Sequence, residues 1–335
     1  MARRIALAAF LLASFAAWGQ APDARLQRLA DAARKEGEVM VYHSTQTEDL
    51  RPVFDAFTKK YGVAVHEWRS SSENVLQRVL RESNAGRHEV DLIENNLPEL
   101  EGLRREKLLR RIDSPVYDTL RAKMAPAHHE YAVSTMDVFV QAYNTQKVKR
   151  EELPKSYQDL LDPRWKGRLG IEAEDEGWFG TLLGAMGEEK GVKLFHDIVA
   201  TNGISVRKGH TLLAQLVASG EVPLALTVYN YKPEQLKAKG GSIDWFVMSP
   251  VVAQMHGVAV HKDAPHPAAA ELLHDFFLSD GQAILAARDF VASSRKVSSP
   301  FDSMEIHFID PAEAIDKDEQ WTKLWEQNVK KRSTD

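Results

Sequence analysis

The sequence predicts an α/β fold in two domains, and three observations support this prediction. Helical and extended patterns alternate along most of the chain, which specifies a mainly parallel sheet with helices on its faces. The chain has 335 residues, and at roughly 100–200 residues per domain this length corresponds to about two domains. A long run of strand-forming residues at 131–143 interrupts the alternation. It looks like a strand that leaves one domain and enters the other.

The composition excludes several classes of protein. Hydrophobic residues make up 44% of the chain and charged residues 27%, which excludes a disordered tail. The chain contains no cysteine, so a disulfide scaffold and a cysteine-based zinc site are excluded as well. The formal net charge of −5 argues against a nucleic-acid-binding protein, because such proteins usually have a basic face.

The first residues have the form of a secretory signal peptide. Arg3 and Arg4 precede an apolar run at 5–18, which is shorter than the ~20 residues that a membrane span needs, and a small-residue cleavage pattern ends at Gly19. We therefore expect a signal peptide at residues 1–19. Because no cysteine is present to accept a lipid, we expect no membrane anchor. A secreted protein without disulfides fits the periplasm of a Gram-negative bacterium.

The first domain begins with alternating helices and strands. Helical spacing of apolar residues predicts helices that end at Gly37 and Gly62, and Ser70 with Glu73 has the form of a capping box. The predicted elements are a helix at 26–36, a strand at 39–42, a helix at 50–61, a strand at 63–68, a helix from about 70, a strand at 90–93 and a helix at 97–105.

The second domain repeats the alternation after the strand at 131–143. Its predicted elements are a strand at 169–171, helices around 181–186 and 192–199, a helix at 211–218 and a strand at 224–228. The C-terminal part adds extended segments at 245–247 and 258–260, helices between 272 and 284, and a last helix with an apolar stripe of Trp321, Leu324, Trp325 and Val329.

Polar loops after the strands are the expected ligand-binding sites, because ligands of parallel sheets bind beyond the carboxyl ends of the strands. Free N–H groups at the following helix starts can hold an oxygen ligand, although Ser, Thr and Asn there also serve as simple caps. The candidate ligand-binding residues are His43, Ser44, Thr45, Gln46, Ser70, Ser71, Glu94, Asn95, Asn96, Gly177, Trp178, His210, Thr211, Tyr229, Asn230 and Tyr231.

The order of these features resembles the solute-binding proteins of bacterial ABC importers, and among them the ferric-ion-binding subgroup. The resemblance rests on the leader, the Val41-Tyr42 strand, the helix that ends in Phe57-Thr-Lys-Lys-Tyr-Gly62 and the strand at 90–93. It also rests on three segments of the later chain: Leu161-Asp-Pro-Arg-Trp-Lys-Gly-Arg168, Ser219-Gly-Glu221 before a strand, and Lys262-Asp-Ala-Pro-His-Pro267 before an Ala-rich helix.

This resemblance implies a class II periplasmic binding protein. Each of its two lobes would be a mixed, mainly parallel sheet flanked by helices, and crossing hinge strands would let the lobes close on a solute. The implied division is residues 20–137 plus 253–335 for lobe 1 and residues 138–252 for lobe 2.

The resemblance also implies a cargo and a ligand set. The iron-binding relatives hold ferric ion with two adjacent tyrosines of the second lobe and with a histidine and a glutamate of the first lobe. Here the pair is split as Tyr229 and Tyr231, while His43 and Glu94 lie two or three residues from the other two places. Phenolate is a hard donor that suits a hard cation. Bound Fe(III) would then be cargo held by these four residues, and no cofactor is expected.

The departures from the family pattern leave other cargoes open. Tyr229 and Tyr231 could form the side of a pocket for an organic ligand. Arg207 and Lys208 at a helix start could attract a carboxylate or phosphonate. In contrast, the loop at 172–178 carries four carboxylates, which would repel an anion held there. A small anionic or zwitterionic organic solute and a polyamine-like cation are therefore alternative cargoes.

The implied function is that of a monomeric periplasmic receptor that delivers a small solute to an inner-membrane ABC permease. A subunit that reports its bound ligand to a membrane sensor kinase would share the same fold. An enzyme would need a nucleophile with its base or a metal-binding motif. The sequence contains no Gly-x-Ser-x-Gly, His-Glu-x-x-His or P-loop pattern.

Overall fold

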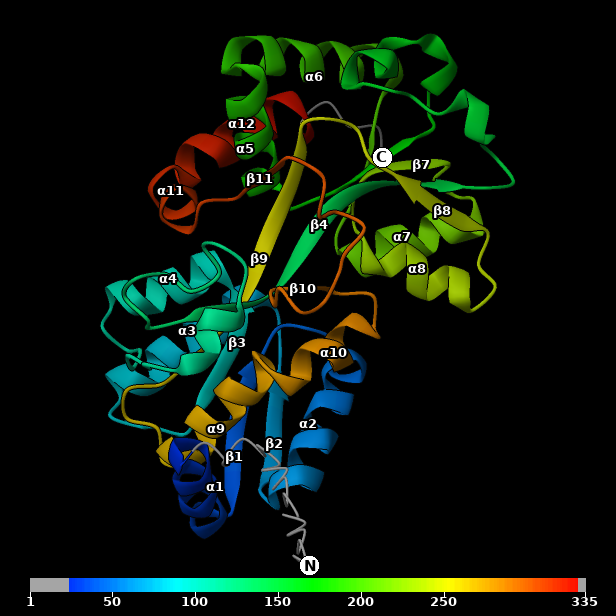
Figure 1. Ribbon diagram of the computed structural model, residues 1–335. Coiled ribbons are helices and arrows are strands. Elements are labelled where there is room, and N and C mark those ends of the chain that lie inside the picture. The colour runs from blue at the N-terminus through cyan, green and yellow to red at the C-terminus, as the bar shows by residue number, and fades with distance from the viewer. Residues whose placement is uncertain (1–23, 331–335) are drawn as a thin grey trace, which may run out of the picture.

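The computed structural model describes residues 24–330, which form two α/β lobes joined by long strands (Figure 1). The two-lobed α/β class predicted from the sequence is thereby confirmed. The predicted signal peptide at residues 1–19 lies outside the described residues. Within residues 24–330, no helix is long and apolar enough to span a bilayer.

The first lobe contains the predicted helix–strand units. They are α1 (Ala24–Glu36), β1 (Glu38–His43), α2 (Thr47–Tyr61), β2 (Ala64–Arg69), α3 (Ser72–Asn84), β3 (Leu92–Asn96) and α4 (Leu97–Arg105). Strand β1 lies between β2 and β3 and is parallel to both. Helix α2 ends at Gly62, whose left-handed φ of 74° suits glycine. Helix α3 is capped one residue later than predicted, because its cap is not Ser70 but the Ser71 hydroxyl, which accepts from the Asn74 N–H.

Two long strands run through both lobes. Strands β4 (Ala132–Asn144) and β9 (Val251–Val260) pair in antiparallel orientation. In the first lobe β9 also pairs with β3, and in the second lobe β4 pairs with β7 (Leu224–Tyr229) and β8 (Ile243–Phe246). A short third segment, β11 (Ile306–Phe308), runs parallel to β9. Figure 1 shows β4 and β9 extending from one lobe into the other, as expected for hinge strands.

The second lobe is built around a short parallel sheet. Strand β5 (Leu169–Glu172) lies between β7 and β6 (Ser205–Arg207). The lobe's helices are α5 (Glu176–Met186), α6 (Glu188–Asn202), α7 (His210–Ser219) and α8 (Tyr231–Ala238). Helix α8 has no counterpart among the predicted elements, since Tyr231 is expected in a loop and is instead its first residue. Short 3₁₀ helices lie in the connections at Pro115–Thr119, Arg150–Glu152, Tyr157–Leu161 and Pro163–Trp165.

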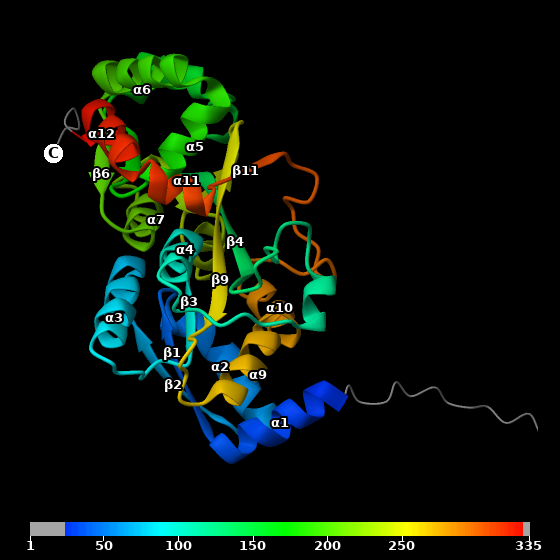
Figure 2. The same cartoon turned by 90° about the vertical axis from the view of Figure 1, so that its left-hand side faces the viewer.

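The C-terminal part of the chain serves both lobes. Helices α9 (Pro267–Phe277) and α10 (Asp280–Ala286) and strand β10 (Val291–Ala292) belong to the first lobe, and β10 pairs with β4. Helices α11 (Pro311–Asp316) and α12 (Asp318–Asn328) follow β11, and Figure 2 shows α12 beside α5 and α6 of the second lobe. Helix α12 is thus the part of 253–335 that packs against the second lobe.

The apolar stripe of α12 explains this placement. Trp325 is fully buried, and its ring lies 6.5 Å from that of Trp178 and 5.4 Å from that of Phe179, centroid to centroid. Gly180 of α5 approaches the Trp321 ring so closely that a Cβ atom there would lie 2.2 Å from it. The stripe thus fills part of the aromatic core of the second lobe.

Candidate functional site

The candidate site lies where strand ends from both lobes meet beside β4 and β9. Glu94, in the middle of β3, is 2% exposed and accepts four hydrogen bonds. Its donors are the Thr45 hydroxyl at 2.8 Å, the N–H groups of Ser44 and Thr45 at 3.3 Å each, and His256 Nδ1 at 2.9 Å. Burial opposes ionisation, but His256, together with His43 and Thr45, holds the pKa of Glu94 below its usual value.

His256 links the first lobe to the hinge strands. Its Nε2 lies 3.3 Å from a carboxylate oxygen of Asp137 on β4, so the imidazole is held between two buried carboxylates. Burial lowers the pKa of a histidine, but Asp137 and Glu94 outweigh this effect and raise the pKa of His256 to about 9. Burial raises the pKa of Asp137 to about 6 despite His256. The Oδ1 atom of Asp137 is buried and has no hydrogen-bond partner among residues 24–330.

The second lobe supplies a buried acidic group with one histidine. Glu172, Asp175 and His210 each offer a donor atom within 4.8 Å of the others. His210 Nε2 lies 3.2 Å from Asp175 Oδ1, and the Glu172 carboxylate accepts from the N–H of Gly209 at 2.7 Å. Burial and the charge of Asp175 raise the pKa of Glu172, whereas Asp175 and Glu172 raise the pKa of His210 against the effect of its burial.

Two atoms of this acidic group have no partner. Asp175 Oδ2 and His210 Nδ1 are buried and lack a hydrogen bond within the described part of the chain. Two nearby carboxylates that share one histidine repel each other in a medium of low dielectric constant. The group is therefore short of positive charge.

The split tyrosine pair forms an aromatic stack beside this acidic group. The rings of Tyr229 and Tyr231 are 6.1 Å apart and nearly parallel, at 16°. His210 covers Tyr229 at 3.9 Å, and Phe290 of the first lobe covers Tyr231 at 4.1 Å. Neither hydroxyl makes a hydrogen bond to any of residues 24–330.

The electrostatic surroundings of the two hydroxyls are strongly negative. Burial raises the pKa of Tyr229 well above its ordinary value, and the charges of Asp175 and Asp137 raise it further. Burial likewise raises the pKa of Tyr231, with Asp137 and Asp49 adding to the effect. The neutral phenols are thus stable only while no cation is near, because a cation would favour the phenolates.

The two lobes are tied together next to Tyr231. Asp49, buried near the start of α2, lies 3.3 Å from Lys232 Nζ of α8 and accepts from Gln235 Nε2 at 2.9 Å. Arg288 of the first lobe donates to the same carboxylate at 2.6 Å. Asn230 adds a second tie, because its Oδ1 accepts from the Val138 N–H and its Nδ2 donates to the Asp289 carbonyl. These contacts hold a closed arrangement on this side.

Replacing Asp49 by asparagine is expected to loosen this closure. The substitution keeps the shape of the side chain but removes the charge that Lys232 faces, and a hydrogen bond to a charged group contributes about 1.5–3 kcal/mol. Small-angle scattering of the unliganded protein should show a larger radius of gyration than the wild type. Asp280→Asn, which removes an exposed carboxylate paired with Lys60, is the control. Equal scattering curves for Asp49→Asn and the wild type would show that the contacts of Asp49 do not hold the two lobes together.

Several predicted site residues are occupied by local contacts. His43 is fully buried, and its two ring nitrogens face the Thr45 carbonyl at 2.9 Å and the Glu67 carboxylate at 2.8 Å. Asn95 and Asn96 donate to the backbone and side chain of Ser72. These contacts orient the loops of the first lobe, and they leave His43 without a free ring nitrogen for a ligand.

The remaining predicted residues have varied settings. Ser70 accepts from the Asn74 side chain, Ser71 caps α3, and Gln46 stands at the cap position of α2 without a capping hydrogen bond. Ser44 has a buried hydroxyl without a partner among residues 24–330. Trp178 is a core residue, Gly177 lies against Ile309, and Thr211 is in the first turn of α7 beside His210.

The charged residues on the crossing strands are absent from the predicted site. Ligands of parallel sheets are expected in loops, whereas Asp137 and His256 lie within β4 and β9. A signal is present, because Asp137 is the only charged residue in the strand-forming run at 131–143. The acidic loop contributes Gly177 and Trp178 to the predicted site, but the residues that form the buried group are Glu172 and Asp175.

The proposed anion-attracting helix start at α7 carries little free positive charge. Lys208 pairs with Glu174 at 2.6 Å, and Arg207 lies 3.8 Å from Glu221. Asp175 and Glu172 lie beside the first residue of the helix, His210. This helix start therefore faces carboxylates, which compete with any anionic ligand.

Comparison with known proteins places the chain among binding proteins. Residues 100–310 match the family described as bacterial extracellular solute-binding protein. The Fe(3+)-binding periplasmic protein of Serratia marcescens is 26% identical over 215 residues, which are 63% of this chain and 62%, less than two thirds, of that protein. Iron uptake protein A1 of a Synechocystis strain is 25% identical over 289 residues, covering 81% of this chain and 79% of the relative.

Solved structures confirm the fold. Iron-bound HitA from Pseudomonas aeruginosa superposes with a TM-score of 0.75 at 20% identity, over 86% of this chain and 99% of that one. At this identity the likeness establishes the two-lobed architecture, and the ligand must be argued from the residues of this chain.

Proposed function

The chain belongs to the family of bacterial extracellular solute-binding proteins, and from this premise we propose that it is the periplasmic receptor of an ABC importer, with ferric iron as its cargo. A receptor of this kind needs no catalytic chemistry. It needs a closed state that binds the cargo more tightly than the open state does. The names of the Serratia and Synechocystis relatives support iron as the cargo and, for the first, the periplasm as the compartment.

The observation that carries the proposal is the pair of unpartnered tyrosine hydroxyls among buried carboxylates. Tyr229 and Tyr231 have no hydrogen bond from their hydroxyls to residues 24–330, and Asp137, Asp175 and Glu172 act on one or both of them. A hard trivalent cation prefers anionic oxygen donors, and phenolates and carboxylates are such donors. Iron would supply the positive charge that this group lacks and would convert both phenols into phenolates.

The ligand set that we propose differs in part from the one implied by the family resemblance. It keeps Tyr229 and Tyr231 and takes Asp175 and His210 as the further donors, because each has a buried atom without a partner among residues 24–330. Glu94 acts through His256, to which it is already bonded, and His43 has no free ring nitrogen. With the Asp175 carboxylate of the acidic loop as a ligand, the iron would need no external anion.

The test is iron loading followed by visible spectroscopy. Purified protein loaded with Fe(III) should show a phenolate-to-iron charge-transfer band, which Tyr229→Phe and Tyr231→Phe should each weaken. Each substitution should also lower the iron affinity at least tenfold, which corresponds to about 1.4 kcal/mol. Tyr61→Phe is the matched control, because Tyr61 is also largely buried but lies in the aromatic cluster of the first lobe, with its ring 5.2 Å from Phe57.

Two outcomes would overturn iron as the cargo. One is a colourless protein whose melting temperature does not change after iron loading. The other is a melting temperature raised by a polyamine or by a carboxylate or phosphonate solute in the absence of iron, since a ligand at 100 times its dissociation constant adds about 2.7 kcal/mol. Delivery to a permease is tested separately, by iron uptake in cells that lack the protein and regain either the wild type or Tyr231→Phe.

A further inference from the structure

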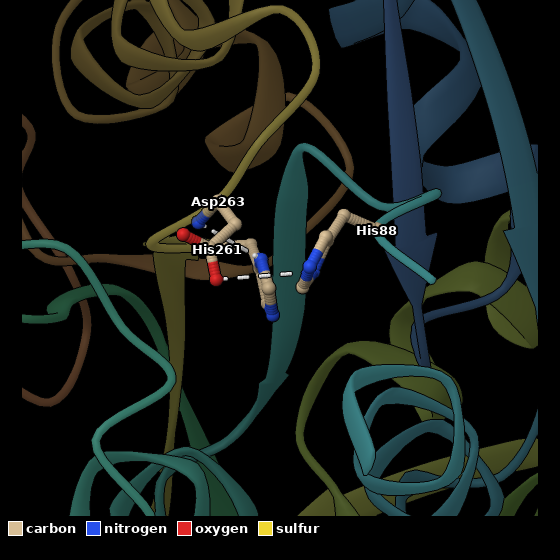
Figure 3. Close-up of side chains that lie close together, drawn as sticks. All are labelled: His88, His261 and Asp263. Carbon is tan, nitrogen blue, oxygen red and sulfur yellow. Dashed lines mark hydrogen bonds and ion pairs between the residues drawn. The ribbon is translucent and has the colours of Figure 1, made fainter. Parts of the chain in front are cut away.

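One cluster of potential metal ligands lies outside the tyrosine site, just beyond the end of β9 in the first lobe. His88, His261 and Asp263 each offer a donor atom within 4.8 Å of the other two (Figure 3). However, His261 Nδ1 accepts from the Asp263 N–H at 3.2 Å, and its Nε2 lies 3.1 Å from the Ser83 hydroxyl. His261 therefore has no free ring nitrogen, and His88 and Asp263 form an exposed ion pair. The cluster provides no second metal site.

All four proposed iron ligands belong to the second lobe. Asp175 precedes α5, His210 begins α7, Tyr229 ends β7 and Tyr231 begins α8. Their coordination of the metal therefore needs no donor atom from the first lobe. The first lobe nevertheless contacts one of these ligands, because the Tyr231 side chain packs into the hydrophobic core of the first lobe. Tyr231 is thus the ligand at which cargo binding and lobe closure meet.

A short segment of the first lobe, residues 288–290 between α10 and β10, covers Tyr231. The Phe290 ring lies 4.1 Å from the Tyr231 ring, centroid to centroid, at an angle of 26°. Both side chains are buried, at 6% and 7% exposure. Tyr229, in contrast, is covered by His210 of its own lobe. Opening of the lobes would therefore take the covering ring away from Tyr231 but not from Tyr229.

Hydrogen bonds hold the same segment against α8 and the residue before it. The Asp289 carbonyl accepts from Asn230 Nδ2 at 3.0 Å, and the Arg288 carbonyl accepts from Gln235 Nε2 at 3.2 Å. Asp289 has a left-handed φ of 69°, a strained conformation for a residue with a Cβ atom that persists where surrounding contacts hold it. Three consecutive residues of the first lobe thus each make a contact with the second lobe.

We propose that residues 288–290 form a latch that holds Tyr231 in its ligating orientation and sets the rate at which the cargo leaves. With the latch in place the Tyr231 ring cannot rotate away from the metal. When the latch is released, Tyr231 can leave while the other three ligands keep their places. Related complexes differ mainly in their dissociation rates, so the latch should act on release more than on capture. The proposal rests on the proposed iron function, and Phe290 is a positioning residue without a donor atom.

Release of iron to a chelator tests the latch. Protein loaded with Fe(III) is mixed with excess EDTA, and the decay of the charge-transfer band gives the release rate. Phe290→Leu removes the ring stack, and Gln235→Ala removes one hydrogen bond from the half-buried surface of α8. Each should release iron about 2–10-fold faster than the wild type. The band maximum and the rate of iron uptake should stay the same, because all four ligands remain.

Phe276→Leu is the matched control for the loss of a buried ring. Phe276 is 3% exposed in the first lobe, but its ring lies against Phe57 and Tyr61. This variant should release iron at the wild-type rate, which separates the latch from core packing in general. Equal release rates for the wild type, Phe290→Leu and Gln235→Ala would overturn the proposal. A shifted band in Phe290→Leu would also overturn it, because the substitution would then change the ligand set itself.

A second measurement tests the latch without iron. Small-angle scattering of metal-free Phe290→Leu should show a larger radius of gyration than the metal-free wild type, whereas Phe276→Leu should not. If the wild type takes up no iron, the proposed cargo is wrong, and the scattering still decides whether residues 288–290 hold the lobes together. Equal radii for Phe290→Leu and the wild type would then overturn the latch.

Discussion

Replacing His256 by glutamine is expected to lower the free energy of unfolding by about 3–5 kcal/mol at pH 6.5, the usual cost of breaking a buried ion pair. The substitution removes the positive charge between Glu94 and Asp137, which are 2% and 1% exposed. Both carboxylates would then be buried without a counter-charge. Urea denaturation at fixed pH measures the change.

The pH dependence gives this prediction a sharper form. The pKa of His256 is raised to about 9 in the folded protein, from an ordinary value of 6.5. Its contribution to stability is therefore complete below pH 6.5 and is lost as the pH rises through about 9, a difference of about 3 kcal/mol. The wild type should lose this stability between pH 6.5 and 9, whereas His256→Gln should not.

His66→Gln is the matched control for this experiment. His66 is an exposed histidine 3.1 Å from the Glu38 carboxylate, so its loss should change stability by less than ~0.5 kcal/mol and preserve the pH profile. The contrary result is that His256→Gln loses the same stability between pH 6.5 and 9 as the wild type. Another group would then titrate in this range, and a charged His256 between Glu94 and Asp137 would be excluded as the cause.

Replacing Trp325 by alanine is expected to cost about 3–5 kcal/mol of stability in the second lobe. The ring is fully buried against Trp178 and Phe179, and its Nε1–H donates to the Ala173 carbonyl at 3.0 Å. The substitution leaves a large cavity and an unpaired carbonyl. Chemical denaturation followed by near-UV circular dichroism should show an earlier transition than in the wild type.

The control for Trp325→Ala is Leu212→Ala in the same lobe. Leu212 is 44% exposed, so its truncation should change the free energy of unfolding by no more than about 0.5 kcal/mol. A loss below ~1 kcal/mol for Trp325→Ala would show that α12 is a peripheral element and not part of the core of the second lobe.

Most of the fold could be predicted from the sequence because the apolar patterns are local. The helix that ends at Gly62 and the long strand β4 lie within a few residues of their predicted bounds. The position of α12 could not be predicted, because a Trp321 and Trp325 stripe indicates that a helix is buried but not against which lobe. Helix α8 is missing from the prediction because its short sequence carries no amphipathic pattern, and only the fold shows that Tyr231 begins it.

The candidate site was predictable only in part, for a related reason. Tyr229 and Tyr231 directly follow the strand predicted at 224–228, so a rule about strand ends identifies them. Asp137 and His256 meet because β4 and β9 pair across the junction of the lobes, with Asp137 opposite Gln254 and His256 opposite Thr135. Such a pairing depends on register between segments more than a hundred residues apart, and a single sequence does not show it.

The place of α12 also has a consequence for biosynthesis and for the engineering of truncated forms. The second lobe draws Trp321, Trp325 and Val329 from the segment that follows the first lobe's last strand, so its core stays incomplete until about residue 329 has been synthesised. The second lobe therefore cannot complete its hydrophobic core early in synthesis. For the same reason, the stretch 138–252 expressed alone would expose Trp178 to water, and a fragment intended to fold independently would have to carry the C-terminal helix with it.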